Sequence, residues 1–167
     1  MHDTELKFIV DHNVGKMAKW LRMAGFDASL FTGSDDAAIV ATALAEKRIL
    51  LTRDRRIMKR RVIVAGRIRA ILIESDDLKA QVQQVLSTLR LDKSRFRPFT
   101  TCLECNRRLE ERSKEAIKDR LPPYVYLTQE HFAECPACRR LYWQGTHWQA
   151  MNREIDGILS FENHHQG

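Results

Sequence analysis

The chain holds four cysteines, and all of them lie in two Cys-x-x-Cys pairs, Cys102/Cys105 and Cys135/Cys138. Two residues between cysteines let both thiolates of a tight turn face one ion, and two such turns complete a tetrahedral site. Because four thiolates leave no open position, the predicted ion is a structural zinc rather than a catalytic one. An iron–sulfur cluster is the alternative metal centre that four thiolates hold. Four reduced thiols without a metal are the remaining alternative.

A second group of candidate residues consists of acids that follow strand-like segments or open helical ones, namely Asp11, Asp35 or Asp36, Asp54 and the acids of 74–77. Converging carboxylates repel each other unless a cation neutralises them, and three or four oxygen ligands suit Mg²⁺ or Mn²⁺. Such an ion activates water and stabilises charge on a phosphoryl oxygen, which is the chemistry of phosphodiester hydrolysis. The alternative is that Asp36 and Asp54 are plain helix N-caps and that Asp11 is a loop residue.

Basic side chains gather around Asp54. The net charge of the chain is +6 and its pI is about 9.4, which favours polyanionic partners and above all nucleic acid. Six basic residues lie close to Asp54 in the sequence: Arg53, Arg55, Arg56, Lys59, Arg60 and Arg61. Lys16, Lys19 and Arg22 form a second basic stripe at helical spacing. The alternative for both sets is a solvated basic face, or ion pairs with the acids themselves.

Strand-like and helix-like segments alternate through the first 90 residues. Strands are predicted over 7–11, 28–32, 48–52 and 69–73, with 62–64 as an extension of the last one. Helices are predicted over 14–24, 37–47 and 78–90, and one or two helical turns over 54–61. This alternation is typical of an α/β fold with a mainly parallel sheet. Sites in such sheets lie outside the carboxyl ends of the strands, which is where Asp11 and Asp54 fall.

The segment 92–100 is polar and basic and contains Pro98, so a domain boundary is predicted there. We expect a main domain over 1–95, a zinc ribbon over 99–150, and a tail over 151–167 that starts with a short helix. The stretch 121–127 is expected to supply a strand between the two cysteine pairs. No apolar run is long enough to span a bilayer and no signal peptide is recognised, so the expected location is the cytoplasm, with no membrane partner.

The motifs resemble a known family. From Asp11 the sequence runs D-x-x-x-G-K-M-A-K-W-L-R-M-A-G-F-D, and R-I-L-L-T-R-D ends at Asp54. This arrangement resembles the PIN-like ribonuclease domain first noted at the C-terminal end of the Mut-seven exonuclease. Stand-alone prokaryotic versions carry a zinc ribbon that ends like C-P-x-C-x-x-x-Y-W-x-G-x-H-W, which the segment 135–148 matches. The resemblance covers roughly residues 7–150 and implies a PIN-like α/β/α sandwich and metal-dependent cleavage of RNA.

The resemblance also implies roles for individual residues. Asp11, Asp36 and Asp54 match the family's metal-binding acids, and Asp76 is the candidate for a fourth. The residues expected to bind RNA are Lys16, Lys19, Arg22, Arg53, Arg55 and Arg56, with Trp143 and His147 stacking on unpaired bases. For the aromatic side chains the alternative is a structural role in the small core of the ribbon.

Two other functions remain open at this point. One is a non-catalytic protein that binds ribosomal or transfer RNA through the same basic surface and ribbon. The other is an adaptor whose ribbon docks on another protein. Because PIN-like domains often pair, a homodimer is a further expectation.

Overall fold

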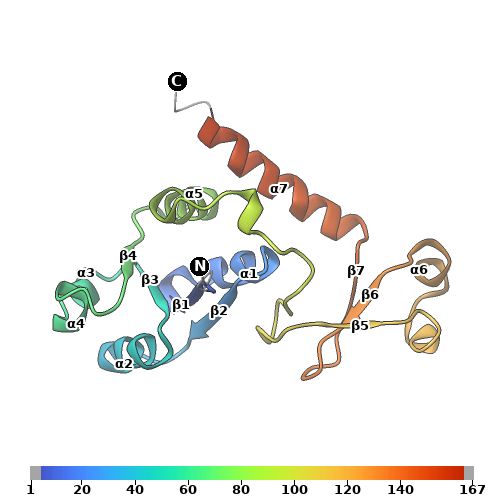
Figure 1. Cartoon of the computed structure of the whole chain (residues 1–167), viewed down its shortest axis with the longest axis horizontal. Helices are drawn as coiled ribbons and strands as arrows, with labels where there is room; N and C mark the ends of the chain where they lie inside the picture. Colours follow the sequence, from blue (N-terminus) through green and yellow to red (C-terminus); the bar gives the residue numbers. More distant parts are fainter. Residues whose placement is uncertain (1–4, 164–167) are drawn as a thin grey trace.

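The computed structural model describes residues 5–163, with side chains described through Leu159. Its N-terminal part is built on a four-stranded sheet in the order β2-β1-β3-β4 (Figure 1). The strands are β1 (Lys7–Asp11), β2 (Asp27–Phe31), β3 (Ile49–Thr52) and β4 (Ala70–Leu72). Neighbouring strands in this sheet run parallel, and Val10 lies opposite both Leu30 and Leu51. The predicted α/β class with a mainly parallel sheet is therefore confirmed.

Helices cover both faces of this sheet. They are α1 (Lys16–Met23), α2 (Asp36–Glu46), α3 (Arg55–Met58), α4 (Arg61–Val64) and α5 (Leu78–Leu89). Successive side chains of a strand point to opposite faces. Phe8 and Val10 accordingly join the buried cluster that includes α1 and α5, whereas Ile9 joins the cluster that includes α2 and α3. The result is a three-layer α/β/α arrangement.

One predicted strand is replaced by a helix. The segment 62–64, expected to extend the last strand, lies in α4, and Val64 is 73% exposed. The β-branched residues Val62, Ile63 and Val64 favour a strand locally. Here the backbone instead closes helical hydrogen bonds to Arg60, at 3.0 Å from the amides of both Ile63 and Val64. The prediction of a strand at 62–64 is therefore wrong.

The cysteine-bearing part contains a three-stranded antiparallel sheet in the order β5-β6-β7. Its strands are β5 (Glu110–Arg112), β6 (Phe132–Glu134) and β7 (Leu141–Trp143). A strand is predicted over 121–127, but most of this stretch lies in the helix α6 (Pro123–Thr128). Proline suits the first helical position because it has no amide hydrogen to leave unpaired, so Pro123 opens α6. Ile117, Leu121 and Phe132 form the small core beside it.

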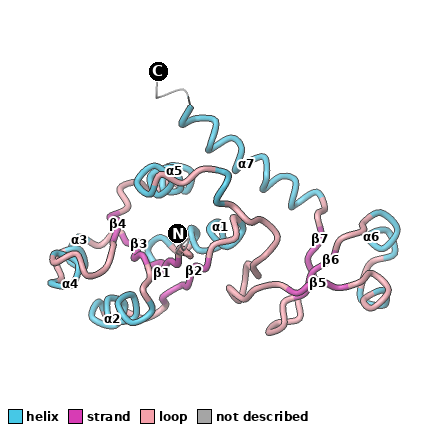
Figure 2. Tube along the Cα trace, viewed as in Figure 1, coloured by secondary structure: helices cyan, strands magenta, loops and turns pink. Residues whose placement is uncertain are grey.

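A long C-terminal helix, α7 (Thr146–Asn163), returns from the ribbon to the main domain (Figures 1 and 2). It is longer than the short helix expected from Met151 and begins before that residue. Ile155 and Ile158 are buried in the same cluster as α1 and α5, and Lys93 Nζ lies 2.6 Å from Asp156 Oδ1. The last helix therefore completes the core of the main domain. Across the described chain, no helix is both long enough and apolar enough to cross a membrane.

Three short 3₁₀ turns complete the described elements: η1 (His12–Val14), η2 (Lys93–Arg95) and η3 (Lys118–Arg120). The first turn follows β1 directly, and the N-cap of this turn is Asp11. The carboxyl end of β1 therefore leads at once into a tight turn, which fixes the direction of the Asp11 side chain.

Candidate functional site

The carboxyl ends of β1 and β3 form the edge at which this topology places a site. The two strands are neighbours, but α1 follows β1 on one face of the sheet while α3 follows β3 on the other. In open parallel sheets, ligands bind outside the strand ends where the connections diverge in this way. Asp11 is the last residue of β1, and Asp54 follows the end of β3 by two residues. Both acids thus lie at the expected edge.

Asp11 is buried and held by hydrogen bonds, with 5% of its surface exposed. Its Oδ2 accepts a hydrogen bond of 2.7 Å from the Thr52 hydroxyl. Its Oδ1 accepts one of 2.9 Å from the His12 amide and lies 3.1 Å from His12 Nδ1. The Thr52 hydroxyl also accepts a hydrogen bond of 3.0 Å from the Asp54 amide. One buried side chain, Thr52, therefore connects the two strand-end acids.

Asp54 is the N-cap of α3 and is paired with an arginine of the same helix. Its Oδ1 accepts a 2.8 Å hydrogen bond from the Arg56 amide, and Arg56 Nη2 lies 3.2 Å from its Oδ2. The hydrogen bonds from the Arg56 side chain and amide hold the pKa of the Asp54 carboxyl below its usual value. The pKa of Arg56 is raised first by its hydrogen bond to Asp54, with the charges of Asp54 and Asp36 adding to the shift. Asp36 is therefore near enough to Arg56 for its charge to act on that side chain.

The fourth candidate, Asp76, lies in the exposed loop between β4 and α5. The N-cap of α5 is Asp77, whose Oδ2 accepts a 3.1 Å hydrogen bond from the Ala80 amide. The N-cap of α2 is Asp35, so Asp36 is the first helical residue rather than the cap. Within the part of the chain that the structure describes, the aspartates do not form a group whose ligand oxygens all lie within 4.8 Å of one another. They follow strands at the same edge of the sheet but do not converge on one point.

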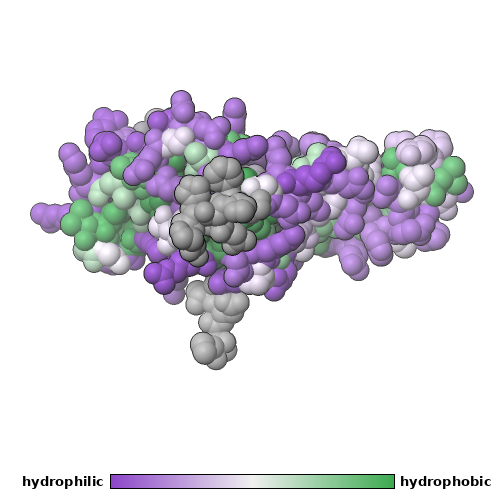
Figure 3. Space-filling view, turned by 90° about the horizontal axis from the view of Figure 1, so that it is seen from above, coloured by the Kyte–Doolittle hydropathy of each residue, from purple (hydrophilic) through white to green (hydrophobic). Residues whose placement is uncertain are grey.

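The predicted basic residues are divided by their exposure. Lys16, Arg53 and Arg55 are exposed, and the Arg53 amide donates a 3.3 Å hydrogen bond to the Asn13 side chain. Lys19 is exposed and pairs with Glu104 at 2.9 Å. In the view of Figure 3, hydrophobic side chains show at both ends of the molecule and in smaller areas between them, and hydrophilic side chains cover much of the remaining visible surface.

Arg22, which is predicted to bind RNA together with Lys16 and Lys19, is buried, with 9% of its surface exposed. Its Nε donates a 2.9 Å hydrogen bond to the Ala28 carbonyl, and its Nη1 donates one of 2.8 Å to the Leu103 carbonyl. The last turn of α1 faces β2 and the first cysteine pair. Helical spacing alone therefore does not predict that this side chain is buried. Arg22 is a link between two parts of the chain.

Trp143 and His147 differ in their surroundings. Trp143 is half-buried and packs on the small core of the ribbon, with its ring centre 6.4 Å from that of Phe132. His147 is exposed in the first turn of α7. Trp148 packs edge-on against Phe99, at 5.3 Å between ring centres. Packing roles are therefore observed for both tryptophans.

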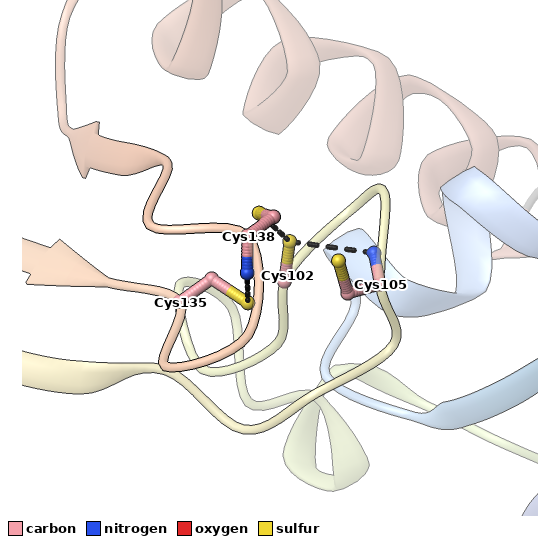
Figure 4. A group of neighbouring side chains, drawn as sticks. All are labelled: Cys102, Cys105, Cys135 and Cys138. Atoms are coloured by element: carbon pink, nitrogen blue, oxygen red, sulfur yellow. Dashed lines mark hydrogen bonds between the residues drawn. The ribbon is translucent and has the colours of Figure 1, made fainter.

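The four cysteines converge as their spacing predicts (Figure 4). Their Sγ atoms all lie within 4.8 Å of one another, and Cys102 Sγ lies 3.7 Å from Cys138 Sγ. Four sulfurs at about 2.3 Å from a tetrahedral zinc ion are about 3.8 Å apart. The side chains therefore fit one tetrahedral ion of the size of zinc.

Both cysteine pairs adopt the same turn. The Asn106 amide donates to the Cys102 carbonyl at 3.0 Å, and the Arg139 amide donates to the Cys135 carbonyl at 2.9 Å. Asn106 and Arg139 both have positive φ, at 60° and 66°. Hydrogen bonding to Cys138 raises the pKa of Cys105 to about 12, whereas a backbone amide, that of Arg140, lowers the pKa of Cys138 to about 7.

Fold and site together define a class of protein. It has an α/β domain with carboxylates at the edge of a parallel sheet where the connections diverge, joined to a ribbon with four cysteines. A family model described as the Mut7-C RNAse domain matches residues 6–155, so the chain belongs to the Mut7-C RNAse domain family. The resemblance seen in the motifs is thereby confirmed. Comparison with curated proteins and with solved structures found no match.

Sequence reasoning did not find several residues that build these sites. Thr52 lies in the L-L-T-R-D motif, whose pattern indicates only the end of a strand. His12 and Asn13 follow Asp11 directly, and this proximity is the only local signal for them. Asn106 follows the first cysteine pair, where a positive φ favours Asn or Gly. Its hydrogen bonds to β2 join residues 78 and 79 positions apart and leave no local signal.

Proposed function

We propose that this protein is a ribonuclease that depends on Mg²⁺ or Mn²⁺ and hydrolyses phosphodiester bonds of RNA. The observation that carries the proposal is the link from Asp11 through the Thr52 hydroxyl to the Asp54 amide at the edge between β1 and β3. Membership of the Mut7-C RNAse domain family supports RNA as the substrate. Asp36, at the start of α2, is the third acid of the proposed site.

The donor set fits a hard divalent ion, because carboxylate oxygens are the ligands that Mg²⁺ and Mn²⁺ prefer. Asp11, Asp36 and Asp54 would hold the ion, with Asp76 as the proposed fourth acid. When bound there, the ion supplies an activated water and neutralises charge on the phosphate. Thr52 and the His12 amide keep the Asp11 carboxylate oriented, since each donates a hydrogen bond to it. Asp54 would hold the ion through its carboxylate, and Arg56, which pairs with that carboxylate in the structure, would then be available to bind the substrate phosphate.

Exposed basic side chains next to Asp54 provide the proposed path of the RNA backbone. Arg53 and Arg55 flank Asp54 in sequence, and Arg56 contacts it. Guanidinium groups suit phosphate because their donors match two phosphate oxygens at once. Lys16, at the start of α1, extends this surface beyond Asp11.

We also propose that the four cysteines hold a structural zinc and that the ribbon helps to position RNA. The ribbon offers His147 as its exposed aromatic side chain among the residues predicted to stack on bases. Trp143 serves the ribbon core, so its contribution to RNA binding is indirect.

The test is cleavage of labelled RNAs by purified protein with Mn²⁺ or Mg²⁺, and with a chelator in place of the ion. Asp54→Asn is the informative variant, because asparagine caps a helix about as well as aspartate does and the fold is retained. Asp92→Asn is the matched control, since Asp92 caps η2 through a 2.8 Å hydrogen bond from the Ser94 amide. We expect metal-dependent cleavage that is lost in Asp54→Asn by at least about a hundredfold and kept in Asp92→Asn. Full activity of Asp54→Asn would refute the assignment of the site.

The second candidate function is non-catalytic binding of ribosomal or transfer RNA. The observation in its favour is that Asp54 already has a structural role as the cap of α3 and the partner of Arg56. In this case the protein binds the labelled RNAs tightly and cuts none of them in any metal. Asp11, Asp36 and Asp54 are then structural residues.

A further inference from the structure

The strand β2 lies at one edge of the main sheet, and its free side faces the first cysteine pair. A strand at the edge of a sheet presents unpaired amide and carbonyl groups, which natural proteins cover to prevent association with other chains. In the sheet order, β2 pairs with β1 on one side only. The groups on its other side therefore need partners from elsewhere in the chain.

Ala28, in the middle of β2, has both of its backbone groups paired by side chains. Its amide donates a 2.9 Å hydrogen bond to Asn106 Oδ1. Its carbonyl accepts one of 2.9 Å from Arg22 Nε. The Arg22 guanidinium also donates to the Leu103 carbonyl, which lies between Cys102 and Cys105. The turn of the first cysteine pair thus covers the edge of β2 as a neighbouring strand would.

The neighbouring residue Asp27 strengthens this contact. Asn106 Nδ2 donates a 2.6 Å hydrogen bond to Asp27 Oδ1, and Arg48 Nη1 lies 2.7 Å from the same oxygen. Burial alone would raise the pKa of Asp27, but the hydrogen bonds from Arg48 and Asn106 outweigh it and lower that pKa. The side-chain amide of Asn106 therefore both accepts and donates hydrogen bonds: its oxygen accepts from Ala28 and its nitrogen donates to Asp27.

The position of Asn106 depends on the turn that carries the cysteines. Its amide bonds the Cys102 carbonyl at 3.0 Å and its φ is 60°, so its side chain points to β2 only while the turn keeps this shape. Two thiolates bound to one ion fix such a turn, and in small metal-binding modules the metal supplies much of the folding free energy. Loss of the metal would therefore release the side chain that pairs with the edge strand.

We propose that Asn106 and Arg22 are positioning residues that couple zinc occupancy of the ribbon to the edge of the main sheet. With zinc bound, the turn over 102–106 covers β2; without zinc, the edge at Ala28 is open. Because β2 leads directly to α2, the same coupling reaches Asp36, the first residue of that helix. This last step rests in addition on the proposed carboxylate metal site, whereas the coupling itself rests only on the proposed zinc. The coupling itself concerns backbone groups and zinc, and stands without any nuclease activity.

The test is the rate of amide hydrogen exchange at Ala28, measured by NMR on the zinc-loaded full chain. Asn106→Gly is the informative variant, because glycine accepts a positive φ and so preserves the turn while the side-chain amide is removed. Arg139→Gly is its matched control: Arg139 holds the equivalent position in the second cysteine turn, and its side chain pairs with Glu134 rather than with β2. We expect exchange at Ala28 to rise by about tenfold in Asn106→Gly and to stay unchanged in Arg139→Gly, with equal zinc content.

Removal of zinc from the wild type with a chelator provides the second arm. The exchange rate at Ala28 is expected to rise at least to the rate seen in zinc-loaded Asn106→Gly. In Asn106→Gly itself, zinc removal is expected to raise this rate by a smaller factor than in the wild type. Arg22→Met tests the same link from α1 without changing a residue of the cysteine turn, because it removes the hydrogen bonds to the Ala28 and Leu103 carbonyls. It is expected to raise exchange at Ala28 even if Asn106→Gly binds zinc poorly. Unchanged protection of Ala28 in both variants, or in the zinc-free wild type, would overturn the proposal. None of these readouts requires RNA or a divalent ion at the carboxylates.

Discussion

Tyr142 contacts the cysteine cluster from β7, a strand that carries no cysteine. Its hydroxyl accepts a 3.1 Å hydrogen bond from the Leu103 amide and lies 3.1 Å from Cys102 Sγ. Because the amide supplies one hydrogen, the hydroxyl hydrogen is free to be donated to the sulfur. Burial, followed by this contact with Cys102, raises the pKa of Tyr142, so the phenol remains a donor over the physiological range. Donors of this kind orient a thiolate and stabilise its charge.

We therefore expect Tyr142→Phe to weaken zinc binding by about tenfold, because loss of such outer partners of metal ligands has effects of this size. The measurement is competition for zinc with a coloured chelator. Tyr124→Phe is the control, since Tyr124 is 75% exposed on α6. Equal affinity of the wild type and Tyr142→Phe would show that the hydroxyl has no influence on the metal.

For single residues, the sequence predicts the metal ligands better than it predicts the residues that orient them. The cysteines are predictable because their spacing within each pair directly encodes the geometry of a tight turn. Asp11 and Asp54 can be located because strand ends have a fixed relation to a parallel sheet. Thr52 contacts Asp11 from a strand 41 residues away, and Tyr142 contacts Cys102 from 40 residues away. Contacts between such distant positions follow from the tertiary packing and have no local pattern.

Among the elements, the end of α1 shows how closely the segment 92–100 packs on the main domain. The Gly25 amide donates to the Arg22 carbonyl and the Phe26 amide to the Leu21 carbonyl, each at 3.0 Å, which is the Schellman arrangement of a helix end. Gly25 has a φ of 94°, and a Cβ at this position would lie 2.2 Å from the Arg97 carbonyl oxygen. The Arg97 amide also donates to the Ala24 carbonyl at 2.8 Å. The segment after α5 is therefore fixed against this turn.

Gly25→Ala is expected to lower the free energy of unfolding by about 3 kcal/mol, through the strain of a positive φ and a clash with backbone that has no room to move. Gly66→Ala separates the two causes, because Gly66 has a φ of 73° but a methyl group at this position would have nothing within 4 Å. For Gly66→Ala the expected loss is about 1 kcal/mol, from the backbone strain alone. Urea denaturation measures both. Equal losses would mean that the contact with Arg97 has no energetic weight.

The elements that the sequence predicts correctly are those with strong periodicity and clear ends. The helix that ends before Gly25 and the strands that carry Asp11 and Asp54 belong to this group. The helix α6 escapes prediction because its apolar and aromatic residues favour a strand locally, while Pro123 favours a helical start. The full length of α7 escapes prediction because its first turns coincide with the aromatic motif at the end of the ribbon, which conceals the start of the helix.

For the whole molecule, the property that matters most for binding a polyanion is where the positive charge lies. The net charge of +6 follows from the sequence, but the sequence does not show which basic residues remain free for a partner. Lys19 pairs with Glu104, and Arg22 is buried against the first cysteine turn. In contrast, Arg60 and Arg61, at the start of α4, are both exposed beyond Asp54. The α3–α4 region is therefore the expected site of phosphate contacts.

This location predicts how RNA binding responds to salt. Each phosphate contact on single-stranded RNA adds about −0.7 to the slope of log K against log salt, so four contacts predict a slope of about −3. The double variant Arg60→Gln/Arg61→Gln should reduce the magnitude of that slope by about 1.4. The control is Lys79→Gln/Arg153→Gln, which removes the same charge from exposed positions on α5 and α7. If both double variants reduce the slope equally, RNA responds only to net charge; a change confined to Arg60 and Arg61 assigns the phosphate path to the surface beside the carboxylates.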